Sequence, residues 1–268
     1  MFFYYLQVGG NEAWKPAPAS QKASVIADVN PMFVTVLNVS KLVEDLSYED
    51  KQKLKYDGPL YFDFDGPDID IVAAKVNQML DKFEAMRLDL DMVRLYATGS
   101  KGFHIEIPQG CFMEKYSKDG LMNLPTIYRE MALELYVDTL DFRVYSQSRG
   151  RMWRRPGVRR DNGKQKVQLT LDQMRGMTTD EYLKVTSNSR PELKTKMPTL
   201  CIDLAIMFTK AQQKVEDGMK KKAKFKADPT AKSKAKSASV GLMQMGVGIK
   251  PDAGFQHLAM QLAIAATT

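Results

Sequence analysis

The stretch Leu60-Tyr61-Phe62-Asp63-Phe64-Asp65-Gly66 decides the fold that we expect for this chain. An apolar, aromatic run that ends in a glycine is typical of a buried strand leading into a turn. Because strand side chains alternate between faces, Tyr61, Asp63 and Asp65 share one face, and Phe62 and Phe64 share the other. Two neighbouring carboxylates on a mostly buried sheet repel each other, and a bound divalent cation removes that cost. The pair therefore indicates either a site for Mg²⁺ or Mn²⁺, or a strand end that exposes its acids to water.

The segments around this strand interleave helix and strand patterns, which predicts an α/β (α+β) class. A helix is expected to begin at Asp68 or Asp70, as its N-cap, and to run to about Arg87. A charged connection with a helical turn is expected over 46–55, and an arginine-rich loop from 146 to the Asn162-Gly163 turn. Further strands are predicted over 32–39, 92–97, 102–107, 141–145 and 165–169, and further helices over 124–140, 171–186 and 200–219.

The net charge of +7 is concentrated in two tracts. Residues 220–236 hold eight lysines against one aspartate, which gives 8 − 1 = +7, so the rest of the chain is neutral in sum. Residues 143–166 hold seven arginines and two lysines against Asp161. Two basic tracts on a neutral body favour a polyanionic partner.

Cysteine content and hydropathy exclude several classes of protein. Cys111 and Cys201 are the two cysteines, too few for a zinc site or a disulfide framework. No apolar run approaches the length of a membrane span, and the first residues lack the features of a signal peptide. We therefore expect a cytoplasmic protein with no zinc and no membrane partner.

The domain organisation that we predict has three parts. Residues 1–219 form one catalytic domain, 220–239 a flexible lysine-rich linker, and 240–268 a helical C-terminal segment. The Lys, Ala and Ser of the linker bury too little apolar surface to offset the entropy of ordering. The last segment repeats apolar residues at helical spacing, so it either docks on a partner, frays as a terminus or begins a truncated domain.

A second cluster of chemical interest is Thr98-Gly99-Ser100-Lys101-Gly102-Phe103-His104-Ile105. Its glycines let backbone N–H groups approach an anion, and Ser100 and Lys101 add donors. In the strand that follows, His104 and Glu106 share one face. If that face aligns with Asp63 and Asp65, the site suits a nucleoside triphosphate, with Lys101 and His104 neutralising phosphate charge. The alternative is a surface turn followed by a histidine with a structural role.

A third cluster joins an aspartate to a dense set of arginines between positions 140 and 160. Asp141 would complete a three-carboxylate metal site. Arginines make planar, bidentate contacts to phosphate, and Trp153 or Tyr145 could stack on a base or sugar. The alternative is a solvated basic loop with Trp153 in the core.

With these three motifs in this order, the chain resembles the archaeo-eukaryotic primase (primase-polymerase) superfamily, in its viral and plasmid branch. Asp63-Phe64-Asp65 resembles the first motif, Ser100 to His104 the second, and Leu140-Asp141 the third. The arginines before Pro156-Gly157, with Gly163-Lys164, are similar to an arginine-proline-glycine and glycine-lysine stretch of that branch. The resemblance covers about residues 30–175.

The resemblance implies a catalytic core built around an RRM-like sheet, with an N-terminal α/β unit beside it. It implies a DNA primase that performs template-directed, two-metal-ion nucleotidyl transfer on single-stranded DNA in phage or plasmid replication. Two Mg²⁺ or Mn²⁺ ions would bind the catalytic residues Asp63, Asp65 and Asp141. We expect the nucleoside triphosphate to contact Ser100, Lys101, Gly102, His104, Arg149 and Arg154. We expect the DNA to contact Arg151, Arg155, Arg159, Arg160 and Lys164, and a replicative helicase to be a partner of the C-terminal segment.

Two other functions stay open at this point. A non-catalytic replication scaffold would bind nucleic acid through residues 220–236 and recruit a helicase through the terminal helix. A metal-dependent nuclease would use the carboxylates to hydrolyse phosphodiesters. The intact set of acids argues against the scaffold, and His104 with Lys101 in a glycine-rich turn favours triphosphate binding over hydrolysis.

Overall fold

The computed structural model describes residues 1–44, 46–113 and 119–227 of the chain. The chain divides into two units, Met1–Val215 and Glu216–Thr268. The predicted segment over 240–268 and most of the predicted linker lie outside the described residues. Helices and strands both contribute to the described part, so the predicted α+β class is confirmed.

The elements of the first unit, in chain order, begin with β1 (Phe3–Gln7), β2 (Lys15–Pro18), η1 (Ala19–Gln21), α1 (Lys22–Val29), β3 (Phe33–Thr35), β4 (Asn38–Val39), α2 (Tyr48–Lys51), β5 (Lys55–Asp57) and β6 (Leu60–Asp65). They continue with α3 (Ile69–Ala85), η2 (Leu90–Met92), β7 (Arg94–Ala97), β8 (Gly102–Ile107), η3 (Gln109–Cys111), β9 (Leu121–Met122) and α4 (Leu124–Glu134). The last are η4 (Phe142–Val144), β10 (Met152–Arg154), β11 (Val167–Leu169), α5 (Leu171–Arg175), α6 (Thr179–Ser187) and α7 (Ile202–Ala227), which runs past the division between the units.

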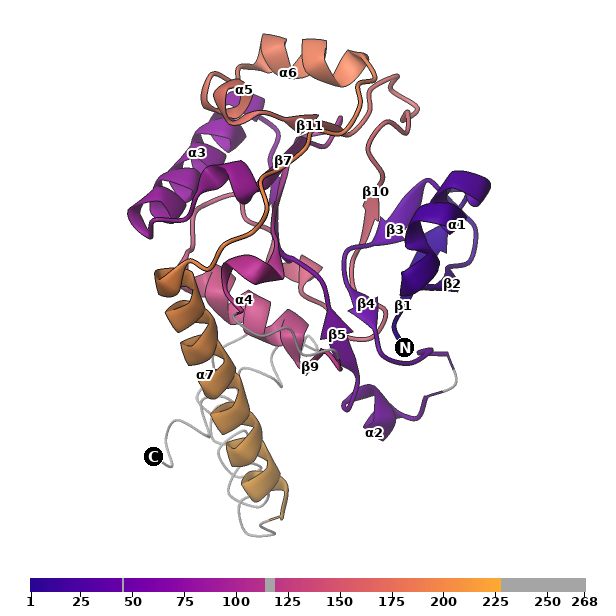
Figure 1. Cartoon of the computed structure of the whole chain (residues 1–268), viewed down its shortest axis with the longest axis vertical. Helices are drawn as coiled ribbons and strands as arrows, with labels where there is room; N and C mark the ends of the chain where they lie inside the picture. The colour runs from indigo at the N-terminus through magenta and orange to yellow at the C-terminus, as the bar shows by residue number, and fades with distance from the viewer. Residues whose placement is uncertain (45, 114–118, 228–268) are drawn as a thin grey trace, which may run out of the picture. The chain divides into compact units, whose positions relative to one another are not determined.

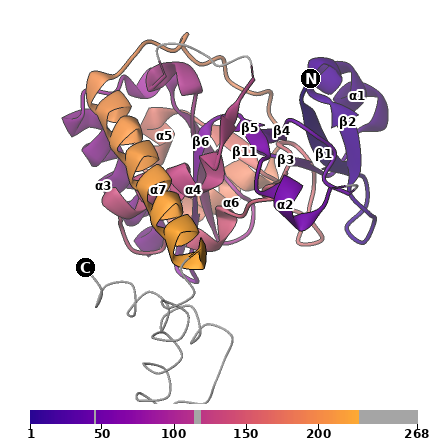
Figure 2. The same cartoon turned by 90° about the horizontal axis from the view of Figure 1, so that it is seen from below.

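The described strands form two antiparallel sheets (Figure 1). The first sheet has the order β10-β3-β1-β4-β5-β9, with β2 paired to β1, and the second has the order β11-β7-β8-β6. Helices α3 and α4 lie on one side of the second sheet, and the strands of the first sheet lie on its other side (Figures 1 and 2). The second sheet therefore has one helix-covered face and one face turned toward the first sheet.

The second sheet gains a further edge from the segment that contains Leu140. Leu140 forms an antiparallel bridge with Phe64 on the side of β6 away from β8. The Asp65 N–H donates to the Thr139 carbonyl at 3.0 Å, and the Asp141 N–H donates to the Asp63 carbonyl at 2.8 Å. Apart from β9, which pairs with β5 in the first sheet, the run β6-α3-β7-β8-α4 followed by this edge is a β-α-β-β-α-β succession.

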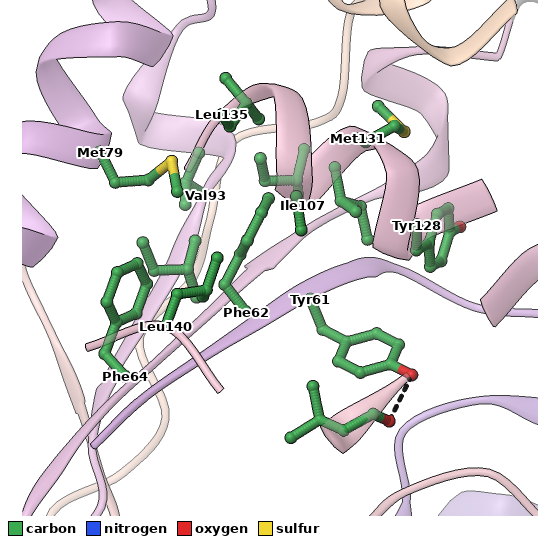
Figure 3. Packing of buried hydrophobic residues seen from close by; sticks show 14 of the residues in the cluster. Tyr61, Phe62, Phe64, Met79, Val93, Ile107, Tyr128, Met131, Leu135 and Leu140 are labelled. Carbon is green, nitrogen blue, oxygen red and sulfur yellow. Dashed lines mark hydrogen bonds between the residues drawn. The ribbon is translucent and has the colours of Figure 1, made fainter. Parts of the chain in front are cut away.

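Strand β6 has the two faces that its alternating sequence predicts. Phe62 and Phe64 lie among buried side chains that include Met79, and the Phe62 ring is 5.7 Å from Phe83 of α3 (Figure 3). Tyr61 points the other way, and its hydroxyl donates to the Val144 carbonyl at 3.1 Å (Figure 3). Burying the aromatic face against α3 fixes which side of the strand carries the carboxylates.

Helix α3 begins as predicted, because the Asp68 carboxylate accepts hydrogen bonds from two N–H groups of the first turn. Helix α4 ends at Glu134, earlier than predicted. The Lys82 ammonium donates to the carbonyls of Leu135 and Tyr136 at 3.0 and 2.7 Å, so those groups need no further helical turn. The predicted helix over 171–186 is two helices, because the chain turns at Gly176 and Thr178 caps α6.

Three predictions for strands and loops are wrong in detail. The predicted strand 32–39 is split into β3 and β4, and between them the Val36 N–H donates to the Arg151 carbonyl. The predicted strand 141–145 is the 3-10 turn η4, because the Asp141 side chain accepts from the Arg143 N–H. The predicted arginine-rich loop contains β10, which pairs with β3. Helix α7 continues through position 219 to Ala227, so the first lysines of the basic tract are helical.

Candidate active site

Three carboxylates project from one face of the second sheet. Asp63 and Asp65 are two positions apart on β6, and Asp141 lies opposite Asp63 across the edge bridge. Residues two apart on a strand, and residues opposite each other on neighbouring strands, share a face. The side chains of Asp63, Asp65 and Asp141 are 6%, 33% and 12% exposed. The sheet thus places three largely shielded acids beside one another.

Pairing of β6 with β8 places the second motif next to these acids. Asp63 lies opposite His104, and Asp65 lies opposite Gly102. The expected alignment of the two polar faces is therefore confirmed. Gly102 permits the pairing, because a Cβ atom there would lie 1.7 Å from the Phe64 carbonyl oxygen. No other residue type leaves room for the two backbones at this point.

Asp141 and Asp65 each have a basic partner that solvent reaches. Arg143 binds Asp141 through both carboxylate oxygens, with Nε–Oδ1 at 2.9 Å and Nη2–Oδ2 at 3.0 Å, although its side chain is 87% exposed. The Lys101 ammonium lies 3.5 Å from an Asp65 oxygen, and its side chain is 60% exposed. Because both cations are exposed, either can leave its carboxylate at small energetic cost.

The pKa values show that the acids influence one another. Burial, together with the charges of Asp63 and Asp141, raises the pKa of the Asp65 carboxyl against the opposing effect of Lys101. The hydrogen bond from Arg143 lowers the pKa of Asp141. A divalent cation would favour the ionised form of all three groups.

His104 is buried between Asp63 and Trp153. Its Nε2 atom lies 3.3 Å from Asp63 Oδ1, and its ring stacks on Trp153 with centroids 3.7 Å apart. Burial lowers the pKa of His104 to about 4, so the imidazole is neutral near pH 7. A neutral imidazole supplies hydrogen bonds and no charge, and that His104 neutralises phosphate charge when a triphosphate binds stays a prediction.

Tyr182 of α6 holds the glycine-rich turn that precedes β8. The Ser100 N–H donates to the Tyr182 hydroxyl at 3.1 Å, and that hydroxyl lies 3.2 Å from the Gly102 carbonyl. Gly99 has a φ of 71°, which a glycine adopts without strain. The side chains of Ser100 and Lys101 remain exposed at this turn. Arg160 reaches the same place, since its Nε donates to the Thr98 carbonyl at 3.0 Å.

Three arginines of the arginine-rich tract have carboxylate partners within the chain, and two of them, Arg149 and Arg151, belong to the predicted phosphate-binding set. Arg149 lies 2.8 Å from Glu44 and over the Tyr5 ring, and Arg151 lies 3.9 Å from Asp63. Arg143 is paired to Asp141, as described above. Glu44 and Asp63 come from distant segments, whereas Asp141 lies two residues from Arg143, so these three arginines are paired without an external anion.

The remaining predicted cations bind carbonyl or hydroxyl groups of the protein. Arg154 lies over the Phe33 ring and donates to the Arg159 carbonyl at 3.2 Å. Arg159 donates to the Gly163 carbonyl at 3.1 Å. Arg155 and Lys164 likewise donate to groups outside the carboxylate face: Asn30 and Pro31 for the first, Leu183 and Ser187 for the second. The structure thus brings Lys101, Gly102, His104 and Arg151 against the acids and places Ser100 and Arg160 at the adjoining turn, whereas Arg149, Arg154, Arg155, Arg159 and Lys164 make their contacts elsewhere.

Hard oxygen ligands on one face suit Mg²⁺ or Mn²⁺ by their chemistry. Within residues 1–44, 46–113 and 119–227, however, no three Asp, Glu, His or Cys side chains form a ready metal-binding group. Arg143 donates hydrogen bonds to both carboxylate oxygens of Asp141, so this carboxylate has no free oxygen directed at a metal ion while that pair is intact. Shared metal binding by the three acids stays a prediction.

Sequence reasoning missed Lys166, which is 3% exposed. Its ammonium lies 4.1 Å from the centre of the Tyr96 ring and 4.7 Å from that of Trp153. Burial lowers the pKa of Lys166 to about 8. The sequence pattern could have placed Lys166 on the polar face of the sheet. In Gln165-Lys166-Val167-Gln168-Leu169, Lys166 and Gln168 alternate with the apolar Val167 and Leu169 and so share one face.

The fold and the site together define an α+β protein with two antiparallel sheets and a carboxylate-bearing face. Comparison with models of known families and with curated proteins finds no match for this chain. In the described part of the chain, no helix combines the length and the apolar character that crossing a bilayer requires.

Proposed function

We propose that this chain is a template-directed nucleotidyltransferase, a DNA primase of the primase-polymerase kind. The observation that carries the proposal is the placement of Asp63, Asp65 and Asp141 on one face, with His104 opposite Asp63. The β-α-β-β-α-β order supports the RRM-like sheet that the sequence resemblance implies. The substrates would be nucleoside triphosphates and single-stranded DNA, in phage or plasmid replication.

In this proposal the three acids hold Mg²⁺ or Mn²⁺. Such ions, when bound, stabilise charge on phosphate oxygens and activate an attacking hydroxyl. The acids fit this role by their oxygen donors and by the burial and mutual repulsion that raise the pKa of Asp65. Arg143 must first release Asp141, and its exposure permits that movement.

The residues beside the acids would bind and orient the triphosphate. His104 is held by its stacking on Trp153, so its ring position is fixed before a substrate arrives. Lys101 and Arg160 lie at the glycine-rich turn and would supply the positive charge that a neutral His104 does not. Arg151, beside Asp63, would meet the DNA strand or the same phosphates.

The finer partners belong to the proposal as well. A replicative helicase would bind through residues 240–268, and the lysine-rich tract would add salt-sensitive affinity for DNA. The proposed setting is the cytoplasm of a host cell.

The test is primer synthesis on single-stranded DNA with labelled nucleotides and Mg²⁺ or Mn²⁺. We expect labelled products from the unmodified chain and a loss of products in Asp141→Asn. Asp138→Asn is the matched control, because Asp138 is 66% exposed, pairs with Lys75 and lies three positions away. Shortening of the DNA would identify a nuclease, and DNA binding without either reaction would identify a scaffold; each result would overturn the proposal.

A further inference from the structure

A pocket of about 350 Å³ lies along the polar face of the second sheet, lined by residues of both sheets. Glu106 lines it, two residues beyond His104 on β8, and Tyr96 lines it from β7. Trp153 and Lys166 line it as well. We call this the basic pocket, after its five cationic residues: Lys22, Arg94, Arg154, Arg155 and Lys166.

The basic pocket has an excess of positive charge. Its five cations face two acids, Glu106 and Glu192, which gives 5 − 2 = +3. Only one close ion pair joins the two sets among the described residues, Arg94 with Glu106 at 3.6 Å. Cations held together without enough acids repel one another, and a bound anion would relieve that repulsion.

Lys166 is the cation of this pocket whose burial without a partner of opposite charge costs the most free energy. It is 97% buried, since 3% of its surface is exposed. In the part of the chain that the structure describes, its ammonium has no hydrogen bond or ion pair, only the rings of Tyr96 and Trp153. Ring contacts replace a small part of the hydration that a buried ammonium loses.

Two further donors near Lys166 are buried without an acceptor in the described residues. They are the indole N–H of Trp153 and the Nε of Arg154, both from β10. Buried donors without acceptors among the residues that line a pocket favour a ligand that carries several acceptor oxygens. A phosphate group has that chemistry, and arginine side chains match its geometry.

We propose that the basic pocket binds a small phosphate-bearing anion, of the phosphate monoester or diphosphate class, at a site separate from the carboxylate face. Its volume is at the small end for ligand pockets, which favours a compact ligand. None of its cations comes from the glycine-rich turn, and none of its acids is one of the three proposed metal ligands. The site goes beyond the proposed function and does not depend on nucleotidyl transfer.

The test is calorimetric titration of the full chain with inorganic pyrophosphate in metal-free buffer containing a chelator. We expect Lys166→Met to weaken binding about tenfold or more, because it removes a buried charge while keeping side-chain volume. Lys41→Met is the matched control, since Lys41 is exposed and lies outside the pocket lining. Glu106→Gln should tighten binding about twofold to fivefold, because it removes an opposing carboxylate.

Three comparisons keep this test decisive. Lys101→Met and the double variant Asp63→Asn, Asp65→Asn should keep the pyrophosphate binding that Lys166→Met weakens, because their residues lie outside the pocket; any separate binding at the glycine-rich turn belongs to the proposed function. Arg94→Leu replaces Lys166→Met if that variant does not fold. Unchanged affinity in the pocket variants, or loss confined to Lys101→Met, would overturn the proposal. So would weakened binding of a single-stranded oligonucleotide without any effect on pyrophosphate. Failure of primer synthesis would leave the pyrophosphate result standing.

Discussion

The carboxylate face and the basic pocket share the polar face of one sheet, yet they treat charge in opposite ways. In the carboxylate face, Asp141 and Asp65 pair with exposed cations. In the basic pocket, cations outnumber acids, and Lys166 is buried against aromatic rings. In the first arrangement, these two carboxylates have a cation of the protein beside them, and they become free to bind a ligand when Arg143 and Lys101 move away. The second is left unsatisfied until an anion arrives. The two sites therefore differ in more than the sign of their charges. Whether each charged side chain already has a partner of opposite charge also indicates which ligand the site can bind.

The substitution that we expect to have the largest effect is at Asp63, which is the least exposed of the three acids. We expect Asp63→Asn to reduce nucleotidyl transfer about 10³-fold, because a neutral amide holds a divalent cation much more weakly than a carboxylate does. The measurement is the single-turnover rate of primer extension, with circular dichroism to confirm folding. Asp138→Asn again serves as the control. A rate within a factor of ten of the unmodified chain would remove Asp63 from the reaction.

A change at Gly102 should damage the carboxylate face through the backbone. The added methyl of Gly102→Ala meets the Phe64 carbonyl, so β8 must move away from β6. We expect a loss of about 3 kcal/mol in the free energy of unfolding, measured by urea titration. Gly163→Ala is a control for loss of a glycine, since nothing lies within 4 Å of a Cβ there, although its φ of 75° adds local strain. Equal stability of the two variants would contradict the close approach.

Lys166 should make stability depend on pH in a window that can be stated. Burial lowers its pKa from 10.5 to about 8. Between these values the unfolded chain holds a proton that the folded chain has released, so stability rises with pH across the window. Below pH 8 both states are protonated, and the full cost of burying the ammonium remains.

Lys166→Met should remove that rise and stabilise the fold by about 2 kcal/mol at pH 7 in phosphate-free buffer. The measurement is urea unfolding of both proteins from pH 7 to 10.5, with the variant subtracted to cancel other groups. A parallel pH profile in the two proteins would show that Lys166 is not strained by its burial.

The smallest effect concerns Arg143, which covers the carboxylate of Asp141. Arg143→Ala should tighten Mn²⁺ binding by no more than about fivefold, because an exposed ion pair competes weakly. Calorimetric titration of Mn²⁺ measures this change, and Arg129→Ala provides a control at another partly exposed arginine. Weaker Mn²⁺ binding in Arg143→Ala would mean that the arginine supports the site instead of blocking it.

Much of the second sheet follows from local sequence. The alternation of acids and phenylalanines in β6 predicted its two faces, and Asp68 predicted the start of α3. The elements that sequence reasoning got wrong depend on distant partners. Strand β10 exists because Trp153 pairs with Val34. Helix α4 ends just before the carbonyl groups that accept hydrogen bonds from Lys82 of α3. Local patterns carry no information about such partners.

The candidate site divides in the same way. Strand periodicity predicted that His104 and Glu106 share a face, and the pairing of β8 with β6, which the sequence left as a condition, places His104 opposite Asp63. The pairing of Arg149 with Glu44 did not, because more than a hundred residues separate them in the chain. Lys166 was overlooked because a lysine in a short strand is usually solvated. Its burial depends on Trp153, which reaches it from the other sheet.

Trp153 can serve as an intrinsic fluorescence probe of the contact between the two sheets. It is one of two tryptophans, it belongs to the first sheet, and its ring touches His104 and Lys166 of the polar face. Substituting the other by Trp14→Phe would leave one indole, whose emission reports on its contacts with His104, Lys166 and Tyr61. Any separation of the two sheets would admit water to the ring and shift its spectrum to longer wavelength. Opening of the molecule on substrate could then be followed in real time without an added dye.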